Sequence, residues 1–350
     1  MNKSLSLYLD LFRFLAAMVV FLSHYASQQL TGGFLWQFKV YDQTAVMVFF
    51  VMSGYVIAFV TCEREKDFKS YAIARLSRLY SIIIPALILT AVLDFVGIQV
   101  NQPLYYEASW PYPDGSQLVH YVLSFFLIQN VWDFQLNPGV NGPFWSLTFE
   151  WFYYLIFAAF FFVRSNSKYL LILVFCLIAG PTIVALLPIW FAGYLLYYVM
   201  QRQLNTSFVK AFLCVTALLV LIILGPYVRN IQTESGWIAR DALWGDYFDA
   251  VVFCVHLYCA PSLLKYIDRF LFPFENVIRW TASLTFALYL FHRPIIQVIA
   301  AIYDGDVSNW IYRIVMLVIT LIVVAVVGRW CEQYKKDLKI QINRLWKIKS

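Results

Sequence analysis

One arginine and one histidine near the start of the sequence are spaced so that they could act together. Arg13 and His24 lie eleven positions apart in an apolar segment long enough to form a helix. Eleven residues turn an α-helix by about 1100°, which is about 20° from a whole number of turns, and rise about 16 Å. Both side chains are therefore expected on one face at different depths. Arginine holds anionic phosphates and neutral imidazole accepts or donates a proton, so the pair predicts transfer chemistry with a phosphate-bearing donor.

Both residues also have interpretations that need no chemistry. Asp10 precedes Arg13 by three positions, a spacing that allows an ion pair on the helix surface. His24 is followed by Tyr25 and could be a hydrogen-bonding residue at the end of the helix. The residues alone leave these alternatives open.

A glutamate within an aromatic segment is the second candidate. Glu150 lies between Trp145 and Tyr153 in an apolar segment. Burial among aromatic rings disfavours the charged form of a carboxylate unless a partner is present. Because Glu150 is expected at a depth similar to that of His24, a contact between the two is predicted. A hydrogen bond from a neighbouring tryptophan or serine to Glu150 is the alternative.

Residues in three further segments could bind a ligand. Arg75 and Arg78 lie three positions apart and could clamp phosphate groups, although basic residues also gather at the cytoplasmic ends of membrane helices. Ser53 and Gly54 permit a close approach of the backbone, either to a ligand or to a packed helix. His292 lies in the middle of another apolar segment, two positions before a proline that frees a backbone carbonyl.

The composition decides what kind of protein must position these groups. Of 350 residues, 62% are hydrophobic and only 13% are charged, whereas soluble domains carry about 25% charged residues. A water-soluble fold is therefore excluded. The 26 basic and 20 acidic residues give a net charge of +6, which does not imply a nucleic-acid partner in a membrane protein. The six cysteines show no C-x-x-C spacing, so neither a metal site nor a disulfide framework is expected.

The apolar segments predict an all-α, polytopic membrane helix bundle with about ten transmembrane helices. An eleventh segment, 117–131, is expected to be a re-entrant or surface helix, because counting it as a span would place Arg164 and Lys168 outside. This topology puts both termini in the cytoplasm. Residues 1–332 are then a transmembrane domain and 333–350 a basic cytoplasmic tail, with no appended soluble domain. The ten predicted spans are 7–28, 42–62, 76–98, 145–163, 169–186, 188–201, 208–225, 243–264, 281–302 and 309–331.

Several segments together resemble the acyltransferase-3 family of bacterial membrane proteins, which move acyl groups, most often acetyl, onto sugars of surface polysaccharides. The matching pieces are Leu9-Asp-Leu-Phe-Arg13 with His24, Phe49-Phe with Ser53-Gly54-Tyr55, Arg75-x-x-Arg78, Trp145-Ser-Leu with Glu150 and Phe152-Tyr153, and Ser283-Leu-Thr-Phe-Ala-Leu-Tyr289-Leu-Phe-His292. The sequence departs from the family pattern at two places, with Asp10-Leu in place of Asp-Gly and Cys331-Glu-Gln-Tyr in place of Glu-x-Pro.

The resemblance implies a membrane O-acetyltransferase of the stand-alone form, without an SGNH domain. It would use acetyl-CoA as co-substrate and no metal, act on a cell-surface polysaccharide or lipid-linked saccharide, and lie in the bacterial inner membrane among membrane lipids. A transporter or flippase for a lipid-linked saccharide or small metabolite, and a non-catalytic scaffold, are the alternatives. The implied site residues are His24, Arg13 and Glu150 for catalysis; Arg75, Arg78, Arg13, Ser53 and Gly54 for the acyl donor; and Trp145, Tyr153, His292 and Asp10 for the acceptor.

Overall fold

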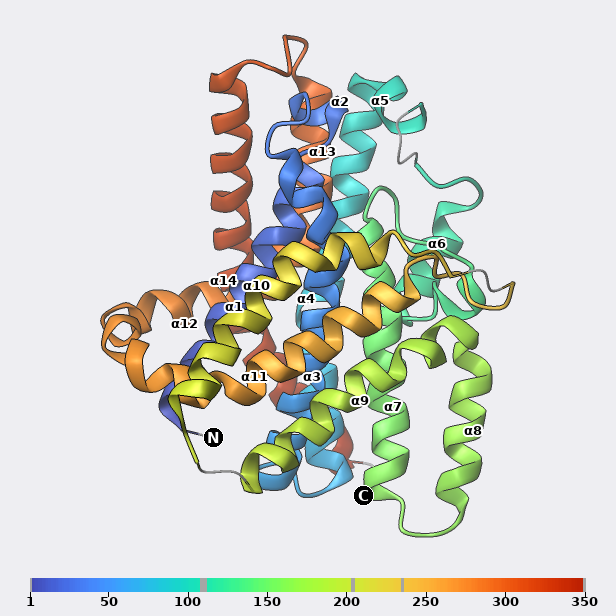
Figure 1. Ribbon diagram of the computed structural model, residues 1–350. Helices are drawn as coiled ribbons and strands as arrows, with labels where there is room; N and C mark the ends of the chain where they lie inside the picture. The colour runs from blue at the N-terminus through green and yellow to red at the C-terminus, as the bar shows by residue number, and fades with distance from the viewer. Residues whose placement is uncertain (1, 108–111, 203–204, 234–235, 349–350) are drawn as a thin grey trace. The chain divides into compact units, whose positions relative to one another are not determined.

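The computed structural model describes residues 2–107, 112–202, 205–233 and 236–348, and within these ranges the regular elements are helices (Figure 1). Nine helical segments in the described ranges are long and apolar enough to cross a bilayer. The prediction of a polytopic helical membrane protein is therefore confirmed. The nine segments are Lys3–Tyr25, Trp36–Glu63, Phe68–Val100, Gly142–Phe162, Pro181–Arg202, Phe208–Arg229, Leu243–Ser283, Thr285–Ile302 and Trp310–Trp346.

The chain forms two compact units, and the first comprises residues up to Val19, Val40–Lys66 and Gly180–Ala282. Its helices pack most extensively as the pairs α10 with α11 and α3 with α9. The unit holds the first part of α1 (Lys3–Tyr25), α3 (Asp42–Glu63), α9 (Pro181–Arg202), α10 (Phe208–Arg229), α11 (Leu243–Leu271) and α12 (Glu275–Ser283).

Two glycines allow α3 and α9 to cross at very short range. A Cβ atom on Gly54 would collide with the carbonyl oxygen of Trp190, and one on Gly193 would collide with the carbonyl oxygen of Val51. Small residues at a crossing let two membrane helices approach backbone to backbone. The side chain of Ser53 completes the contact, because its Oγ accepts a hydrogen bond from the Trp190 indole at 3.2 Å.

A buried charge network joins α10 and α11 in the same unit. Arg229 pairs with Asp249 at 2.5 Å and with Asp246 at 3.0 Å, and Arg240 also pairs with Asp246, at 2.5 Å. Both aspartates are fully buried. Two cations and two anions balance one another, which is the condition under which buried charges are tolerated.

The second unit comprises Val20–Lys39, Asp67–Ala179 and residues from Ser283 onward. Its long helix α4 packs against α13 and α14, and α7 packs against α8. The unit holds the end of α1, α2 (Gln28–Thr31), α4 (Phe68–Val100), α5 (Gln102–Tyr106), α6 (Gln117–Phe125), α7 (Trp145–Phe162), α8 (Ser167–Ala179), α13 (Thr285–Ile302) and α14 (Trp310–Ile348).

The predicted boundary between the spans 169–186 and 188–201 is wrong. The chain breaks at Gly180, whose φ of 89° is accessible mainly to glycine, and α9 then begins at Pro181. Pro188, the expected break, lies inside α9, as prolines can in membrane helices whose freed carbonyls find other donors. Helix α8 therefore has only 13 residues, fewer than the about 20 that span a bilayer perpendicular to its plane.

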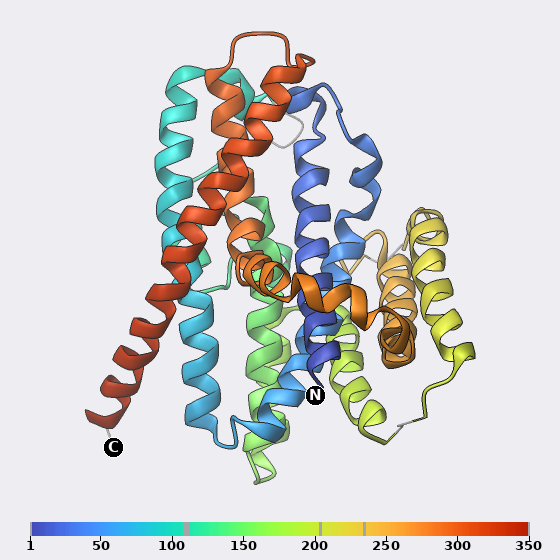
Figure 2. The same cartoon turned by 90° about the vertical axis from the view of Figure 1, so that its left-hand side faces the viewer.

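Two other elements bear on the predicted topology. Segment 117–131 contains the nine-residue helix α6, which is shorter than the about 20 residues of a span; its re-entrant or surface location stays a prediction. Helix α14 continues for 39 residues without interruption, and Figure 2 shows it as one continuous helix that runs down to the C-terminus. The segment from 333 onward, expected as a basic tail, is thus helical as far as Ile348; its cytoplasmic location stays a prediction.

Candidate functional site

Two histidines from opposite ends of the sequence meet in the second unit. The Nδ1 atom of His24 lies 2.7 Å from Nε2 of His292, and the two rings stack with an interplanar angle of 13°. His24 belongs to the last turn of α1 and His292 to the middle of α13. His292 is fully buried, whereas His24 keeps part of its surface exposed. The sequence singled out both residues but did not predict that they pair.

The hydrogen bonds of this pair determine where the protons lie when both rings are neutral. Nδ1 of His292 lies 2.7 Å from the carbonyl oxygen of Leu288, which can only accept, so Nδ1 of His292 carries the hydrogen. Its Nε2 is then the acceptor, and Nδ1 of His24 must donate to it. The lone pair of neutral His24 is consequently on Nε2, as in histidines whose other nitrogen is oriented by a second group. This is the protonation state that a general base requires.

The arginines of α4 lie beside two tyrosines. The guanidinium carbon of Arg75 lies 5.5 Å from the ring centre of Tyr71 and 5.7 Å from the ring centre of Tyr154. Arg75 is buried. The two tyrosines are connected, because Tyr71 donates a hydrogen bond to the Tyr154 carbonyl at 3.1 Å. Arg78 acts electrostatically on Tyr154. The predicted pair Arg75 and Arg78 thus lies where α4 faces α7.

Glu150 belongs to this same part of the second unit. Its Oε1 accepts a hydrogen bond from the hydroxyl of Tyr154, one turn further along α7. The structure therefore brings Glu150 together with Tyr154, Arg75 and Arg78. The predicted contact between Glu150 and His24 stays a prediction.

Arg13 and Asp10 form the ion pair that their spacing predicts, at 3.7 Å. Asp10 also pairs with Arg279 of α12 at 3.1 Å, and Arg279 in turn bonds Glu275 at 3.0 Å. Within the first unit, Arg13 is thus held by a network of charges. Neither side chain of the Arg13–Asp10 pair is fully buried, which leaves Arg13 accessible to an anion.

The remaining predicted residues occupy ordinary packing positions. Ser53 and Gly54 lie at the crossing of α3 with α9, and this crossing explains both residue types; a role in binding the acyl donor stays a prediction. Trp145 contacts Phe149 edge to face with 5.0 Å between ring centres, and Tyr153 is fully buried. Their proposed contact with a sugar likewise stays a prediction.

Four buried polar residues near His292 were not identified from the sequence. Asp94, Tyr105, Asn141 and Gln297 are each at most 1% exposed. Asp94 could have been found, since it is the only charged residue in the predicted span 76–98 apart from Arg78 near the start. The other three give no signal in the sequence, because uncharged polar residues occur throughout membrane helices.

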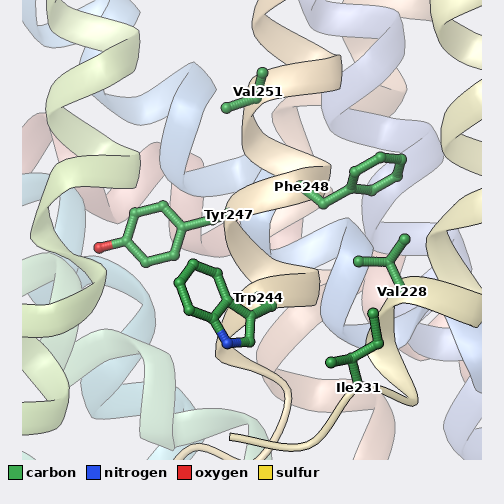
Figure 3. Close-up of a pocket in the computed structure, with 6 residues that line it drawn as sticks. All are labelled: Val228, Ile231, Trp244, Tyr247, Phe248 and Val251. Carbon is green, nitrogen blue, oxygen red and sulfur yellow. The ribbon is translucent and has the colours of Figure 1, made fainter.

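A large apolar pocket of about 670 Å³ lies elsewhere, in the first unit. Figure 3 shows that its side chains come from α11, the end of α10 and the segment that follows. The described lining contains no histidine, arginine or acid, so it offers no group for acyl transfer. The lining residues are Val228, Ile231, Trp244, Tyr247, Phe248 and Val251. Within the described residues, no cluster of three or more histidine, cysteine, aspartate or glutamate side chains could hold a metal ion.

Comparison with known proteins identifies relatives of the chain. An O-acetyl transferase of Shigella phage Sf6 is 29% identical to the chain over 152 residues, which is 42% of this chain and 43% of that protein. The alignment thus spans less than half of the relative. No solved structure is significantly similar to the chain. A family model described as "Acyltransferase domain" matches residues 6–329, which include each of the predicted site residues. The chain therefore belongs to the acyltransferase-3 family.

Proposed function

We propose that the protein is a membrane O-acyltransferase that moves an acetyl group from cytosolic acetyl-CoA to a hydroxyl of a cell-surface polysaccharide or lipid-linked sugar. The observation that carries this proposal is the His24–His292 pair, which gives neutral His24 a basic Nε2 atom in a residue that is partly exposed. The phage O-acetyl transferase supports the choice of acetyl and oxygen as the group and the acceptor atom.

In the proposed reaction, Nε2 of His24 removes the proton from the acceptor hydroxyl as the oxygen attacks the thioester carbonyl. An alcohol is a poor nucleophile at neutral pH, and proton removal during the attack overcomes this. The carbon–sulfur bond then breaks, and the thiolate of CoA takes the proton from His24. The products are an acetyl ester and CoA, and His24 returns to its starting state.

His292 and Glu150 support the charge that forms on His24. The carbonyl of Leu288 and the ring of His292 fix the orientation of His24 through two hydrogen bonds of 2.7 Å. A carboxylate near an imidazolium stabilises it electrostatically, which is the role proposed for Glu150. An acetyl-imidazole formed on His24 is the variant of this mechanism, and a labelled acyl-enzyme trapped without acceptor would identify it.

We also propose that the protein lies in the bacterial inner membrane with both termini in the cytoplasm, and that the donor enters from the cytoplasmic side. Arg75 and Arg78, with Arg13, would hold the phosphates of CoA, because guanidinium groups bind phosphate through paired hydrogen bonds. Ser53 and Gly54 are proposed to contact the donor. Asp10, Trp145, Tyr153 and His292 are proposed to contact the acceptor, whose sugar faces would stack on the aromatic rings.

The decisive experiment follows label from radioactive acetyl-CoA into glycan with membranes that contain wild-type protein, His24→Ala or His120→Gln. His120 is a matched control, since it is buried and bonds the Asn137 carbonyl at 3.2 Å but has no proposed role. We expect transfer by the wild type and by His120→Gln but not by His24→Ala, at equal protein levels. Equal transfer by His24→Ala would refute the role of His24. A transporter would show neither label transfer nor thermal stabilisation by CoA, which mass action requires of a true ligand.

A further inference from the structure

Four buried side chains of the second unit form a cluster beside the histidine pair. This acceptor cluster consists of Asp94 on α4, Tyr105 on α5, Asn141 before α7 and Gln297 on α13. Residues from four segments far apart in the sequence therefore converge at one place.

The orientation of each cluster side chain is fixed by a bond or by a close contact. Oδ2 of Asp94 accepts a hydrogen bond from the Val140 amide at 3.0 Å. Nδ2 of Asn141 donates to the Leu290 carbonyl at 2.8 Å, and Nε2 of Gln297 donates to the Leu104 carbonyl at 3.0 Å. The hydroxyl of Tyr105 lies over Gly97, where a Cβ atom would collide with it.

Each of the four side chains has one polar atom that makes no hydrogen bond within the described residues. Oδ1 of Asp94, Oδ1 of Asn141, Oε1 of Gln297 and the hydroxyl of Tyr105 are buried and make no hydrogen bond within the described residues. Native proteins leave few buried polar atoms unsatisfied, because each costs a desolvation penalty. The amide oxygens of Asn141 and Gln297 can only accept, as can Oδ1 of Asp94 when the carboxyl is ionised, so a molecule that donates hydrogen bonds would satisfy them.

Arg293 connects the cluster with the reacting histidines. It follows His292 directly on α13, is 5% exposed, and acts electrostatically on His24 and on Asp94. Asp94 and Arg293 both act on Tyr105: burial raises the pKa of this phenol, the Asp94 carboxylate adds to the rise and Arg293 opposes it. The cluster and the base therefore belong to one electrostatic neighbourhood.

The chemistry of the cluster suits a neutral sugar better than the phosphates of CoA. The open amide oxygens of Asn141 and Gln297 accept hydrogen bonds from sugar hydroxyls but cannot bond a phosphate oxygen, which is itself an acceptor. Ionised Asp94 likewise accepts from a hydroxyl, and Arg293 balances its charge. Tyr105 and Val140 form a small apolar core against which Tyr112 packs, and such surfaces suit the carbon–hydrogen faces of a sugar ring. Burial and the neighbouring Asp94 charge raise the pKa of Tyr112 to about 12, so its hydroxyl stays protonated and can donate.

We propose that Asp94, Tyr105, Asn141 and Gln297 form the acceptor subsite, in which the hydroxyls of an uncharged sugar residue bind to the unsatisfied oxygens beside His24. This inference rests on the proposed function and adds the residues that would select the acceptor.

Two variants test the subsite with little structural disturbance. Asp94→Asn keeps an oxygen for the Val140 amide but replaces the open acceptor oxygen by an NH₂ donor. Tyr105→Phe removes a hydroxyl that bonds nothing within the described residues, so a purely structural role predicts no loss of stability. Thr320→Val is the matched control, since it removes a buried hydroxyl whose hydrogen bond, 2.7 Å to the Met316 carbonyl, lies within α14.

The probe is surface glycan from the source bacterium, freed of its ester groups by mild alkali and titrated against purified full-length protein with acetyl-CoA. We expect the KM for glycan to rise at least tenfold in Asp94→Asn and severalfold in Tyr105→Phe, with the KM for acetyl-CoA within twofold of wild type. Thr320→Val should keep both values. Should Asp94→Asn fail to fold, Tyr105→Phe alone decides the question.

Three results would overturn the subsite. The first is an unchanged KM for glycan in both variants. The second is an equal rise of the KM for glycan and of the KM for acetyl-CoA. The third is a fall in Tm with no change in either KM, and this third result would mean that water alone fills the cluster. Each of them presupposes that the wild type acetylates the glycan. A wild type that transfers no acetyl would instead refute the proposed function, so the two failures are distinguishable.

Discussion

His24 and His292 meet at 2.7 Å between Nδ1 and Nε2, although they come from the first and the thirteenth α-helix of the chain. A single carbonyl, that of Leu288, sets the tautomer of His292 and through it the tautomer of His24. The basic nitrogen of His24 is thus selected by a backbone atom of another helix. This gives His292 a positioning role for His24, in addition to its proposed contact with the acceptor.

Replacing His292 by leucine should lower kcat by about 10²-fold or more, because His24 then loses the acceptor that fixes its tautomer and ring orientation. The KM for acetyl-CoA should stay within twofold. His292→Gln should recover part of the rate, since its side-chain oxygen can accept from Nδ1 of His24. Steady-state kinetics of the three proteins provide the test, and identical kcat values for the leucine and glutamine variants would contradict it.

Replacing Arg75 by lysine should raise the KM for acetyl-CoA about tenfold and leave the KM for glycan unchanged. The guanidinium packs near the rings of Tyr71 and Tyr154, and a lysine lacks the planar fork that binds phosphate and stacks on aromatic faces. Lys168→Ala is the control, because this cation lies outside the proposed site and is partly exposed. Titration of CoA in a thermal-shift assay measures the affinity independently of turnover; equal affinity of Arg75→Lys and wild type would argue against donor binding.

Replacing Gly54 by alanine should destabilise the protein by about 1–3 kcal/mol or more, since the new methyl group meets the backbone of Trp190, which cannot rotate away. Gly236→Ala is the control, because nothing lies within 4 Å of a Cβ atom there. The measurement is thermal unfolding of the purified protein. It also separates two roles: a packing role lowers Tm and leaves CoA affinity unchanged in the folded protein, whereas a donor-binding role changes that affinity.

Replacing Asp249 by alanine should destabilise the protein by about 3–5 kcal/mol, because Arg229 and Arg240 are then left with the single buried carboxylate of Asp246, and one positive charge is uncompensated. The double variant Arg229→Met with Asp249→Leu should be more stable than the single variant, since Arg240 still balances Asp246. Thermal unfolding of the three proteins tests this. A double variant that is less stable than Asp249→Ala would show that the network contributes more than charge balance.

Much of the fold could be predicted because membrane helices are recognisable by length and apolarity alone. Contacts between residues three or four positions apart on one helix also follow from helical spacing. Examples are the ion pair of Asp10 with Arg13 and the hydrogen bond of Tyr154 to Glu150. The break at Gly180 was missed because Pro188 is the stronger breaker in water, and in a membrane helix its freed carbonyl can be satisfied elsewhere.

The centre of the candidate site could not be predicted in the same way. The pairing of His24 with His292 depends on how α1 and α13 pack, and the pattern of apolar residues in the sequence does not determine which helices pack together. The acceptor cluster depends on convergence of four segments, three of which contribute an uncharged residue. Only Asp94 could be recognised from its residue type, because an acid inside an apolar span is rare in membrane proteins and marks a functional position.

The length of α14 limits how this helix can lie in a bilayer. Its 39 residues correspond to about 58 Å at 1.5 Å per residue, and a tilt of about 40°, near the upper limit for membrane helices, still leaves about 44 Å along the membrane normal. The hydrocarbon layer is about 30 Å thick. At least three turns of the helix must therefore stand in the headgroup region or in water, and Lys335, Lys336 and Lys339 would bring positive charge to the anionic lipid surface there.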